Sequence, residues 1–399
     1  MLDDVDLLVC GAGPVGCVVA ERAARVLGWK VLVVDRRRHL AGNCHDAPHA
    51  NGVLVHRYGP HYFRTNDEAL LRYLSRFTDW VPANFEVRAS VGGRLLPFPI
   101  NLTTLEQFFG RPLDAESAER LLAEKRVPCA NPRNSEEFVL SRVGRELYEA
   151  FYLNYTLKQW GMHPRDLAPS VCGRIPVRLD RDHRYVGHLF QVMPARGFTA
   201  LFARMLRHRK IRVLLDCDFR EVRPLVVPRH ATVYTGPVDE YFDHRLGRLP
   251  YRSLRFEHVA SRAEFVQPCV QINYPNDSPW TRSVEIKHVT GQRHPMTVVS
   301  WETPQATGEP YYPVPAPANT ALYRHYEQLA EEETARRQVY FCGRLAQYRY
   351  FNTDEVIGEA LKCFERIRRD IPVAGRRSAW SPTTSTTSCA TAASAPTTG

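Results

Sequence analysis

The sequence of 399 residues lacks the features that mark membrane and secreted proteins. No apolar run approaches the ~20 residues that a membrane-spanning helix needs. The N-terminus has neither the basic segment nor the apolar core of a secretory signal. We therefore expect a protein of the cytoplasm without a membrane span.

Cysteine pairs are missing as well. The ten cysteines are scattered along the chain, and no Cys-x-x-Cys pair occurs among them. This distribution fits buried thiols in a reducing compartment and argues against structural zinc, so we expect no metal site.

The basic residues do not cluster in a tract, although the net charge is +10. No zinc-finger or RNP-type pattern accompanies them, so we expect no nucleic-acid partner and favour a phosphorylated small substrate. Residues 375–399 are rich in Ser, Thr and Ala and form a low-complexity tail that cannot bury a core. The rest is long enough for two or three structural units.

What is present is a dinucleotide-binding fingerprint at residues 5–35. Gly11, Gly13 and Gly16 follow a predicted strand and open a helix, and a second strand ends at Asp35. The glycines permit a tight turn, close approach to a pyrophosphate and close packing of helix on strand. Asp35 lies at the distance where a carboxylate accepts from a ribose hydroxyl. An ordinary α/β glycine turn is the alternative interpretation.

The residues after Asp35 distinguish between dinucleotides. The Arg36–Arg38 cluster could bind a 2′-phosphate, but the carboxylate of Asp35 would repel it. A second glycine turn at Ala41-Gly42-Asn43 indicates a longer, buried flavin adenine dinucleotide. No second fingerprint occurs, so we expect no dedicated NAD(P)H domain.

The later pattern predicts a discontinuous nucleotide-binding domain with two insertions. Thr65 and Asn66 could cap a helix over 67–77, Gly92-Gly93 forms a hairpin within 85–99, and residues 103–161 are helical in pattern. The expected parts are a nucleotide-binding domain (1–77, 195–240, 336–372), a helical insertion (100–165) and an antiparallel sheet that binds substrate (78–99, 166–194, 241–335).

Aromatic residues gather at the end of the helical insertion, within 151–160. Tyr152, Tyr155 or Thr156, and Trp160 share one helix face by their spacing. Core packing and a platform for a flat base both fit this composition. His61, in an aromatic turn, is equally open: a satisfied loop histidine or a functional one.

The ordered set of motifs resembles bacterial UDP-galactopyranose mutases from about residue 5 to 365. Besides the fingerprint, the resemblance rests on blocks such as Tyr58-Gly-Pro-His61, Tyr155-Thr-x-Lys-Gln-Trp-Gly161, Arg174-Ile-Pro-Val-Arg178, Tyr234-Thr-Gly-Pro237 and Glu309-Pro-Tyr-Tyr-Pro313. It implies an α/β fold: a Rossmann-like FAD-binding domain with an inserted helical domain and an antiparallel β-sheet domain, in a homodimer.

The resemblance also implies site residues. Uracil would stack on Tyr155, and Arg174 and Arg282 would bind the diphosphate through their planar guanidinium groups. The implied catalytic residues are His61, Arg174, Arg282 and Arg344. Those implied for the cofactor are Gly11, Gly13, Gly16, Asp35, Gly42, Asn43, His61, Gly236, Gly343 and Arg344. Those implied for the substrate are Asn84, Tyr155, Thr156, Trp160, Arg174, Tyr185, Arg252, Asn273, Arg282, Tyr312, Tyr350 and Asn352.

The implied reaction is the reversible ring contraction of UDP-galactopyranose to UDP-galactofuranose by an isomerase. In such enzymes, N5 of reduced FAD attacks sugar C1, UDP leaves, and a flavin–iminium intermediate recloses without net redox change. A diffusible reductant such as NAD(P)H would reduce the flavin, and the product would supply galactofuranose for cell-surface glycans and the cell wall.

Some residues depart from the family pattern, notably Val186, Phe351 and Asn352. Val186 alters part of the expected uracil pocket, and Asn352 removes a carboxylate near the phosphates. We expect altered affinity and retained chemistry. Two other functions stay open: an amine oxidase-like flavin oxidoreductase and a non-catalytic nucleotide-binding protein.

Overall fold

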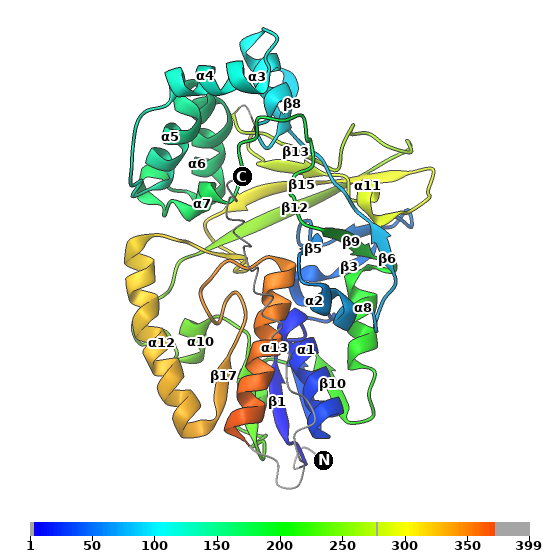
Figure 1. Cartoon of the computed structure of the whole chain (residues 1–399). Helices are drawn as coiled ribbons and strands as arrows, with labels where there is room; N and C mark the ends of the chain where they lie inside the picture. The colour runs from blue at the N-terminus through cyan, green and yellow to red at the C-terminus, as the bar shows by residue number, and fades with distance from the viewer. Residues whose placement is uncertain (1–3, 277, 372–399) are drawn as a thin grey trace, which may run out of the picture.

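The computed structural model describes residues 4–276 and 278–371. Its lower half in Figure 1 is a parallel sheet covered by helices, and its upper half holds a second sheet and a group of helices. Within the described ranges, no helix combines the length and apolarity needed to cross a bilayer. The described residues also contain no cluster of three His, Cys, Asp or Glu side chains that could hold a metal ion.

The five-stranded sheet has every neighbouring pair of strands parallel. Its central strand is almost completely buried and apolar, as expected for a sheet covered on both faces. In spatial order the strands are β10 (Ile211–Leu215), β2 (Val31–Asp35), β1 (Leu7–Cys10), β11 (Ala231–Tyr234) and β17 (Val339–Phe341).

Helices cover both faces of this sheet. One face carries α1 (Pro14–Arg22), which continues as a π-helical turn (Ala23–Leu27), with α8 (Gly197–Leu206) and α13 (Thr353–Asp370) packed against it. The other face carries the short helices α9 (Phe219–Val222) and α10 (Val238–Tyr241), with α12 (Pro317–Arg337) outside α10.

The second sheet has seven strands and is antiparallel at most of its pairs. The sequence predicts a purely antiparallel layer, but β13 pairs with β7 in parallel. The order is β16 (Tyr312–Pro313), β12 (Tyr251–Ser261), β15 (Thr297–Gln305), β14 (Arg282–Val284), β13 (Gln271–Asn273), β7 (Val87–Val91) and β8 (Arg94–Phe98).

Smaller sheets connect the two halves. A three-stranded sheet contains β5 (Phe63–Thr65), β9 (Phe190–Pro194) and β6 (Trp80–Pro82), and a two-stranded one contains β3 (Asp46–Pro48) and β4 (Leu54–His56). A 3₁₀ turn (Gly42–Cys44), α2 (Glu68–Leu74) and α11 (Lys287–Thr290) lie beside them. The expected cap of α2 was wrong: Asp67, not Thr65 or Asn66, accepts the backbone N–H of Leu70 at 3.0 Å.

The helical group occupies the top of Figure 1. It contains α3 (Leu102–Phe109), α4 (Ala115–Lys125), α5 (Ser135–Tyr148), a π-helical turn (Glu149–Leu153), α6 (Asn154–Trp160), a 3₁₀ turn (Pro164–Asp166) and α7 (Ser170–Gly173). Asn101 and Asp114 begin α3 and α4 with capping boxes, which satisfy otherwise unpaired N–H groups.

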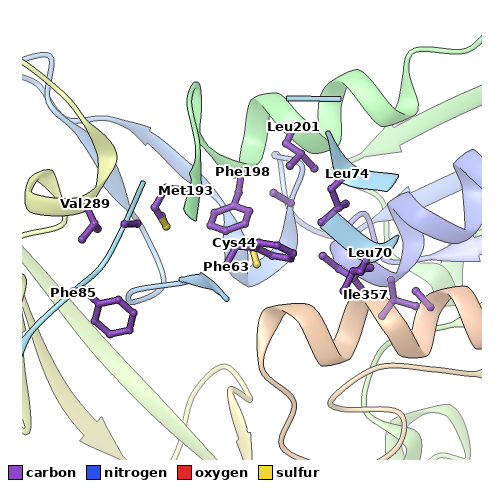
Figure 2. Close-up of a cluster of buried hydrophobic side chains, with 14 of the residues drawn as sticks. Cys44, Phe63, Leu70, Leu74, Phe85, Met193, Phe198, Leu201, Val289 and Ile357 are labelled. Atoms are coloured by element: carbon purple, nitrogen blue, oxygen red, sulfur yellow. The ribbon is translucent and has the colours of Figure 1, made fainter. Parts of the chain in front are cut away.

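One continuous core links the layers. Figure 2 shows part of it: Phe85 and Val289 of the second sheet's half lie at one end of the cluster, and Phe63, Leu70 and Phe198 of the parallel-sheet half lie toward the other. All five side chains are at most 5% exposed. The two halves are therefore packed against each other by one shared core.

Candidate functional site

The larger cavity lies at the carboxyl ends of the parallel strands. Residues at the ends of β1, β2 and β11 line it, with Gly343 just after β17 and the N-terminal turns of α1 and α13. Its volume is about 1650 Å³, counting the space that is open to solvent. In open parallel sheets, nucleotides bind at this edge. Of the predicted cofactor residues, it is lined by Gly11, Gly13, Asp35, Gly42, Asn43, His61, Gly236, Gly343 and Arg344.

The glycine positions fit a dinucleotide. Gly11 has a φ of +104°, and a Cβ on Gly16 would lie 1.8 Å from the Gly11 carbonyl oxygen, so Gly16 packs α1 on its strand below the cavity. A Cβ on Gly42 would lie 3.0 Å from the Cα of Gly13. The two glycine turns therefore meet as bare backbone at the start of α1, where a pyrophosphate can approach N–H groups.

Asp35 lines the same cavity at the end of β2. Its carboxylate accepts the N–H of Ala12 at 2.7 Å and the N–H of Arg37 at 2.8 Å. These bonds fix the carboxylate beside the glycine turn, while its remaining lone pairs are available to a ribose hydroxyl.

His61 is held as a neutral imidazole. Burial, with Arg344 and His56 adding to it, lowers the pKa of His61 to about 3. Nδ1 lies 3.0 Å from the Gly59 carbonyl, which can only accept, so Nδ1 carries the proton. Nε2 is then an acceptor, and the residue lines the larger cavity, which is called the cofactor cavity from here on.

A second cavity, of about 830 Å³, lies between α6 and the second sheet. Of the predicted substrate residues, it is lined by Tyr155, Thr156, Trp160, Arg174, Tyr185, Asn273, Arg282, Tyr312 and Tyr350. These residues come from segments spread over about half of the chain. Phe151 and Tyr152 are buried at 3% and 6% exposure and Tyr155 is half-buried, and all three line this cavity, so the cluster both packs in the core and borders the cavity.

A stack of side chains separates the two cavities. The guanidinium of Arg174 lies 4.6 Å from the ring centroid of Tyr350, and that of Arg344 lies 4.9 Å from it. Arg344 also lies 5.2 Å from the ring of Tyr312. Arg344 lines the cofactor cavity, and Tyr350 lines the second cavity, which is called the substrate cavity from here on. The stack is therefore the common wall of the two cavities.

Charge is concentrated around Tyr350. Burial alone would raise the pKa of its phenol, but Arg174, Arg344, Arg64 and Arg282 outweigh burial and lower that pKa to about 8. These arginines form a field of positive charge that suits a diphosphate.

Arg282 has a buried carboxylate partner. Nε donates to Glu302 Oε2 at 2.6 Å across the β14–β15 pair, and Nη2 lies 3.4 Å from the Tyr312 hydroxyl. Glu302 is fully buried, and its Oε1 has no hydrogen-bond partner. Sequence reasoning missed Glu302, because only the strand register places it opposite Arg282.

Three predicted substrate residues lie outside the second cavity. Asn84 is exposed between β6 and β7. Asn352 caps α13, accepts from Arg64 at 2.9 Å and lines the cofactor cavity. Arg252 donates to the carbonyls of Gln159 at 2.9 Å and Lys158 at 3.1 Å, at the end of α6.

Lys158 has a positioning role that its motif alone did not reveal. Its Nζ lies 2.5, 2.9 and 3.1 Å from the carbonyl oxygens of Tyr274, Ser278 and Trp280. These bonds tie α6 to the turn between β13 and β14. Asn273 ends β13 and Arg282 begins β14, so the two residues flank this turn. Lys158 and Arg252 thus both link α6, on one side of this cavity, to the second sheet on the other.

Comparisons with known proteins identify similar sequences. The sequence profile of the family described as UDP-galactopyranose mutase matches residues 150–350, and that of an NAD(P)-binding Rossmann-like domain matches residues 9–77. A probable UDP-galactopyranose mutase of Klebsiella pneumoniae is 38% identical, over 90% of this chain and 94% of that protein. A dTDP-fucopyranose mutase of Escherichia coli is 34% identical, over 90% of this chain and 97% of that protein.

Solved structures share the fold. A crystal structure of reduced UDP-galactopyranose mutase superposes with a TM-score of 0.72 at 16% identity, covering 92% of this chain and 96% of that one. A putative protoporphyrinogen oxidase from Exiguobacterium has a TM-score of 0.62 at 14% identity, covering 92% of this chain and 99% of that one. At these identities the likeness shows the fold alone.

Proposed function

The chain belongs to the UDP-galactopyranose mutase family, and from that premise we propose that it interconverts UDP-galactopyranose and UDP-galactofuranose. The observation that supports this most is the shared wall between the two cavities. A nucleotide sugar in the arginine-lined cavity would bring its sugar to Arg344 and Tyr350, beside the cofactor cavity.

The cofactor of this isomerase is FAD in its reduced form. When bound, reduced FAD supplies a nucleophilic N5 for displacement of UDP from sugar C1, with no net oxidation. Gly13 and Gly42 would admit the pyrophosphate, and Asp35 would accept from the adenosine ribose. His61 would present an unprotonated Nε2 to the flavin ring, and the start of α13 would offer its N–H groups to a ring carbonyl.

The substrate residues act by binding and orientation. Arg174 and Arg282 would hold the diphosphate, which must leave and return, and the hydroxyls of Tyr185, Tyr312 and Tyr350 would donate to its oxygens. Tyr155 would stack on the uracil. Together these contacts would keep the sugar C1 in position for attack from the cofactor cavity.

A glycosidase-type mechanism fits the site poorly. Such a mechanism needs two carboxyl groups flanking the bond that breaks. Among the described residues lining the substrate cavity there is no Asp or Glu, and the nearby Glu302 is engaged by Arg282. The arrangement supports covalent catalysis by the cofactor, with the protein stabilising the leaving nucleotide.

Several finer points belong to the proposal. A diffusible reductant such as NAD(P)H would reduce the flavin, the chain would work as a homodimer in the cytoplasm, and its product would supply cell-surface galactofuranose. The family resemblance supports these points.

The deciding experiment is turnover by the FAD-loaded protein reduced with dithionite. UDP-galactofuranose should be converted to UDP-galactopyranose while the flavin stays reduced. Chromatography of the nucleotide sugars measures this conversion. The oxidised protein should be inactive, and Arg174→Ala should lose nearly all turnover while keeping its yellow flavin. Stoichiometric flavin oxidation would favour the oxidoreductase alternative. Faster turnover of dTDP-fucopyranose would mean that the proposed substrate is wrong and that the proposed class of reaction is right.

A further inference from the structure

The turn that carries His61 is closed by a second histidine, His56, at the end of β4. The backbone N–H of His61 donates to Nδ1 of His56 at 3.1 Å. His56 is 3% exposed, and burial lowers its pKa, so its imidazole is neutral and has one acceptor nitrogen and one N–H. Because the donor on the other side is a backbone N–H, the acceptor is Nδ1, and the proton of His56 is on Nε2.

The two histidines therefore carry their protons on opposite ring nitrogens. His61 keeps its proton on Nδ1, which faces the carbonyl of Gly59 at 3.0 Å, and its Nε2 is an acceptor. His56 keeps its proton on Nε2, and its Nδ1 is an acceptor. One bond fixes the backbone of His61 and the other fixes its ring, so the imidazole that lines the cofactor cavity is held from two directions.

A buried carboxylate, Asp46, lies behind His56. Its Oδ2 is 3.9 Å from Nε2 of His56, too far for a hydrogen bond, and Nε2 has no hydrogen-bond partner among the described residues. The carboxylate instead accepts the backbone N–H groups of Phe198 at 2.6 Å and Thr199 at 2.9 Å, at the start of α8, where negative charge is stabilised. The charge of Asp46 favours the tautomer of His56 whose N–H faces it.

We propose that His56 is a positioning residue for the cofactor site: its Nδ1 holds the backbone of His61 and thereby keeps the His61 imidazole at the cofactor cavity. This inference rests on the proposed function, in which Nε2 of His61 meets the flavin ring. His56 precedes the Tyr58–His61 block, so the motif that indicates His61 assigns no role to it.

Two variants separate the acceptor atom of His56 from the volume of its ring. His56→Asn keeps an acceptor oxygen close to the place of Nδ1, and His56→Leu keeps a similar volume without an acceptor. His258→Leu is the matched control, because Nδ1 of His258 also has a short polar contact, 2.8 Å from the hydroxyl of Ser300, but the residue lines neither cavity.

Three measurements on the FAD-loaded protein test the inference. NMR of the protein labelled with ¹⁵N-histidine distinguishes protonated from unprotonated ring nitrogens, and His56→Asn identifies the signals of His56 by their loss. The absorbance spectrum of the oxidised flavin reports the surroundings of its ring. Steady-state turnover of UDP-galactofuranose by the reduced enzyme gives kcat and KM separately.

We expect the wild type to carry the proton of His56 on Nε2. His56→Leu should lower kcat roughly 10-fold, because the N–H of His61 loses its acceptor, with little change in KM, because the substrate cavity has other walls. The absorbance bands of the flavin should shift in the same variant. His56→Asn should restore most of kcat and the wild-type spectrum, and His258→Leu should match the wild type in both.

Three results would overturn the inference. A proton on Nδ1 of His56 in the wild type would show that this nitrogen does not accept from His61. Equal losses in His56→Asn and His56→Leu would make the ring and not its acceptor atom responsible. An unchanged kcat and spectrum in His56→Leu would show that the bond does not position His61.

The test does not depend on a single variant. If His56→Leu does not fold, the tautomer of the wild type and the turnover of His56→Asn still decide the inference. A wild type that binds FAD but does not turn over UDP-galactofuranose would refute the proposed function, whereas the tautomer of His56 and the flavin spectra of the variants would still test the role of His56.

Discussion

Arg282, which we propose binds the diphosphate, also has a buried ionic partner in Glu302. Burial raises the pKa of Glu302, and the guanidinium of Arg282, at 2.6 Å, opposes that rise. Glu302 is fully buried with one oxygen unpaired, so its charge depends on Arg282. Removing one member of such a pair is far more costly than removing both.

We therefore expect Arg282→Met to lower the free energy of unfolding by about 3–5 kcal/mol, because it leaves a buried carboxylate unpaired. Adding Glu302→Gln to the same chain should recover most of this loss. Urea denaturation of the FAD-loaded protein at pH 7 measures both. Arg174→Met is the control, since Arg174 contacts the ring of Tyr350; an equal loss in that variant would contradict the explanation.

Tyr350 gives a prediction on pH. Four arginines, opposed by burial, lower the pKa of its phenol to about 8. Below that pH the hydroxyl can donate to a phosphate oxygen, and above it the phenolate repels the diphosphate. Since kcat/KM reports the free enzyme, kcat/KM should fall as pH rises through about 8, with little change in kcat.

Steady-state assays of the reduced enzyme from pH 6.5 to 9.5 would measure this profile. Tyr350→Phe should have a lower kcat/KM at pH 7 and should lose the decline assigned to the phenol. Tyr323→Phe, on the outer helix α12, serves as the control. A decline that persists unchanged in Tyr350→Phe would assign the titration to another group.

At the scale of elements, α6 matters because it is a short helix fastened at both ends. Asn154, at its start, donates to Asn276 at 3.0 Å, and Arg252 donates to the carbonyls at its end. Lys158 ties its middle to the turn between β13 and β14. The helical backbone runs into α6 from the preceding π-helical turn without a break, and these side-chain contacts tie its course to the second sheet.

Lys158→Met should therefore raise the KM for the nucleotide sugar by roughly 10-fold, because an unpaired group of carbonyls would release the turn from α6. FAD binding should be unaffected, because its cavity lies at the other sheet. Kinetics and flavin absorbance measure these two quantities. Lys362→Met, on an exposed face of α13, is the control. A loss of flavin in Lys158→Met would contradict the prediction, because it would show that Lys158 supports the cofactor cavity.

The same scale separates what the sequence could predict from what it could not. The strand–helix–strand unit around Gly11 and Asp35 was predictable, because glycine spacing and apolar strands act locally. The parallel pairing of β13 with β7 and the opposition of Arg282 and Glu302 were not, since they depend on register between distant segments. Local pattern likewise could not show that Arg252 would bind helix carbonyls.

For the whole molecule, the chemistry depends on two cavities built from opposite halves of the fold. The parallel sheet supplies the dinucleotide edge, and α6 with the second sheet supplies the arginine-lined cavity. The core in Figure 2 extends from one half to the other. The motifs identify the parts through family resemblance, but only the fold shows that Arg344 and Tyr350 form the shared wall.

Acid should destabilise the whole molecule through half-buried histidines that the fold keeps neutral. Burial lowers the pKa of His45 and of His258 to about 4, and that of His61 to about 3. In the unfolded chain a histidine titrates near 6.5, so below that pH the unfolded state binds more protons and gains stability. The free energy of unfolding should therefore fall as pH decreases from 7.5 to 5, by at most about 1.4 kcal/mol per pH unit for each such group.

Urea denaturation of the FAD-loaded protein across this range gives the slope of the free energy of unfolding against pH. His258 lies outside both cavities, and His258→Gln should lower the number of protons taken up on unfolding by up to one, which makes the slope shallower. Exposed His325→Gln should leave the slope nearly unchanged. An unchanged slope in His258→Gln would mean that its imidazole takes up protons in the folded state as readily as in the unfolded chain.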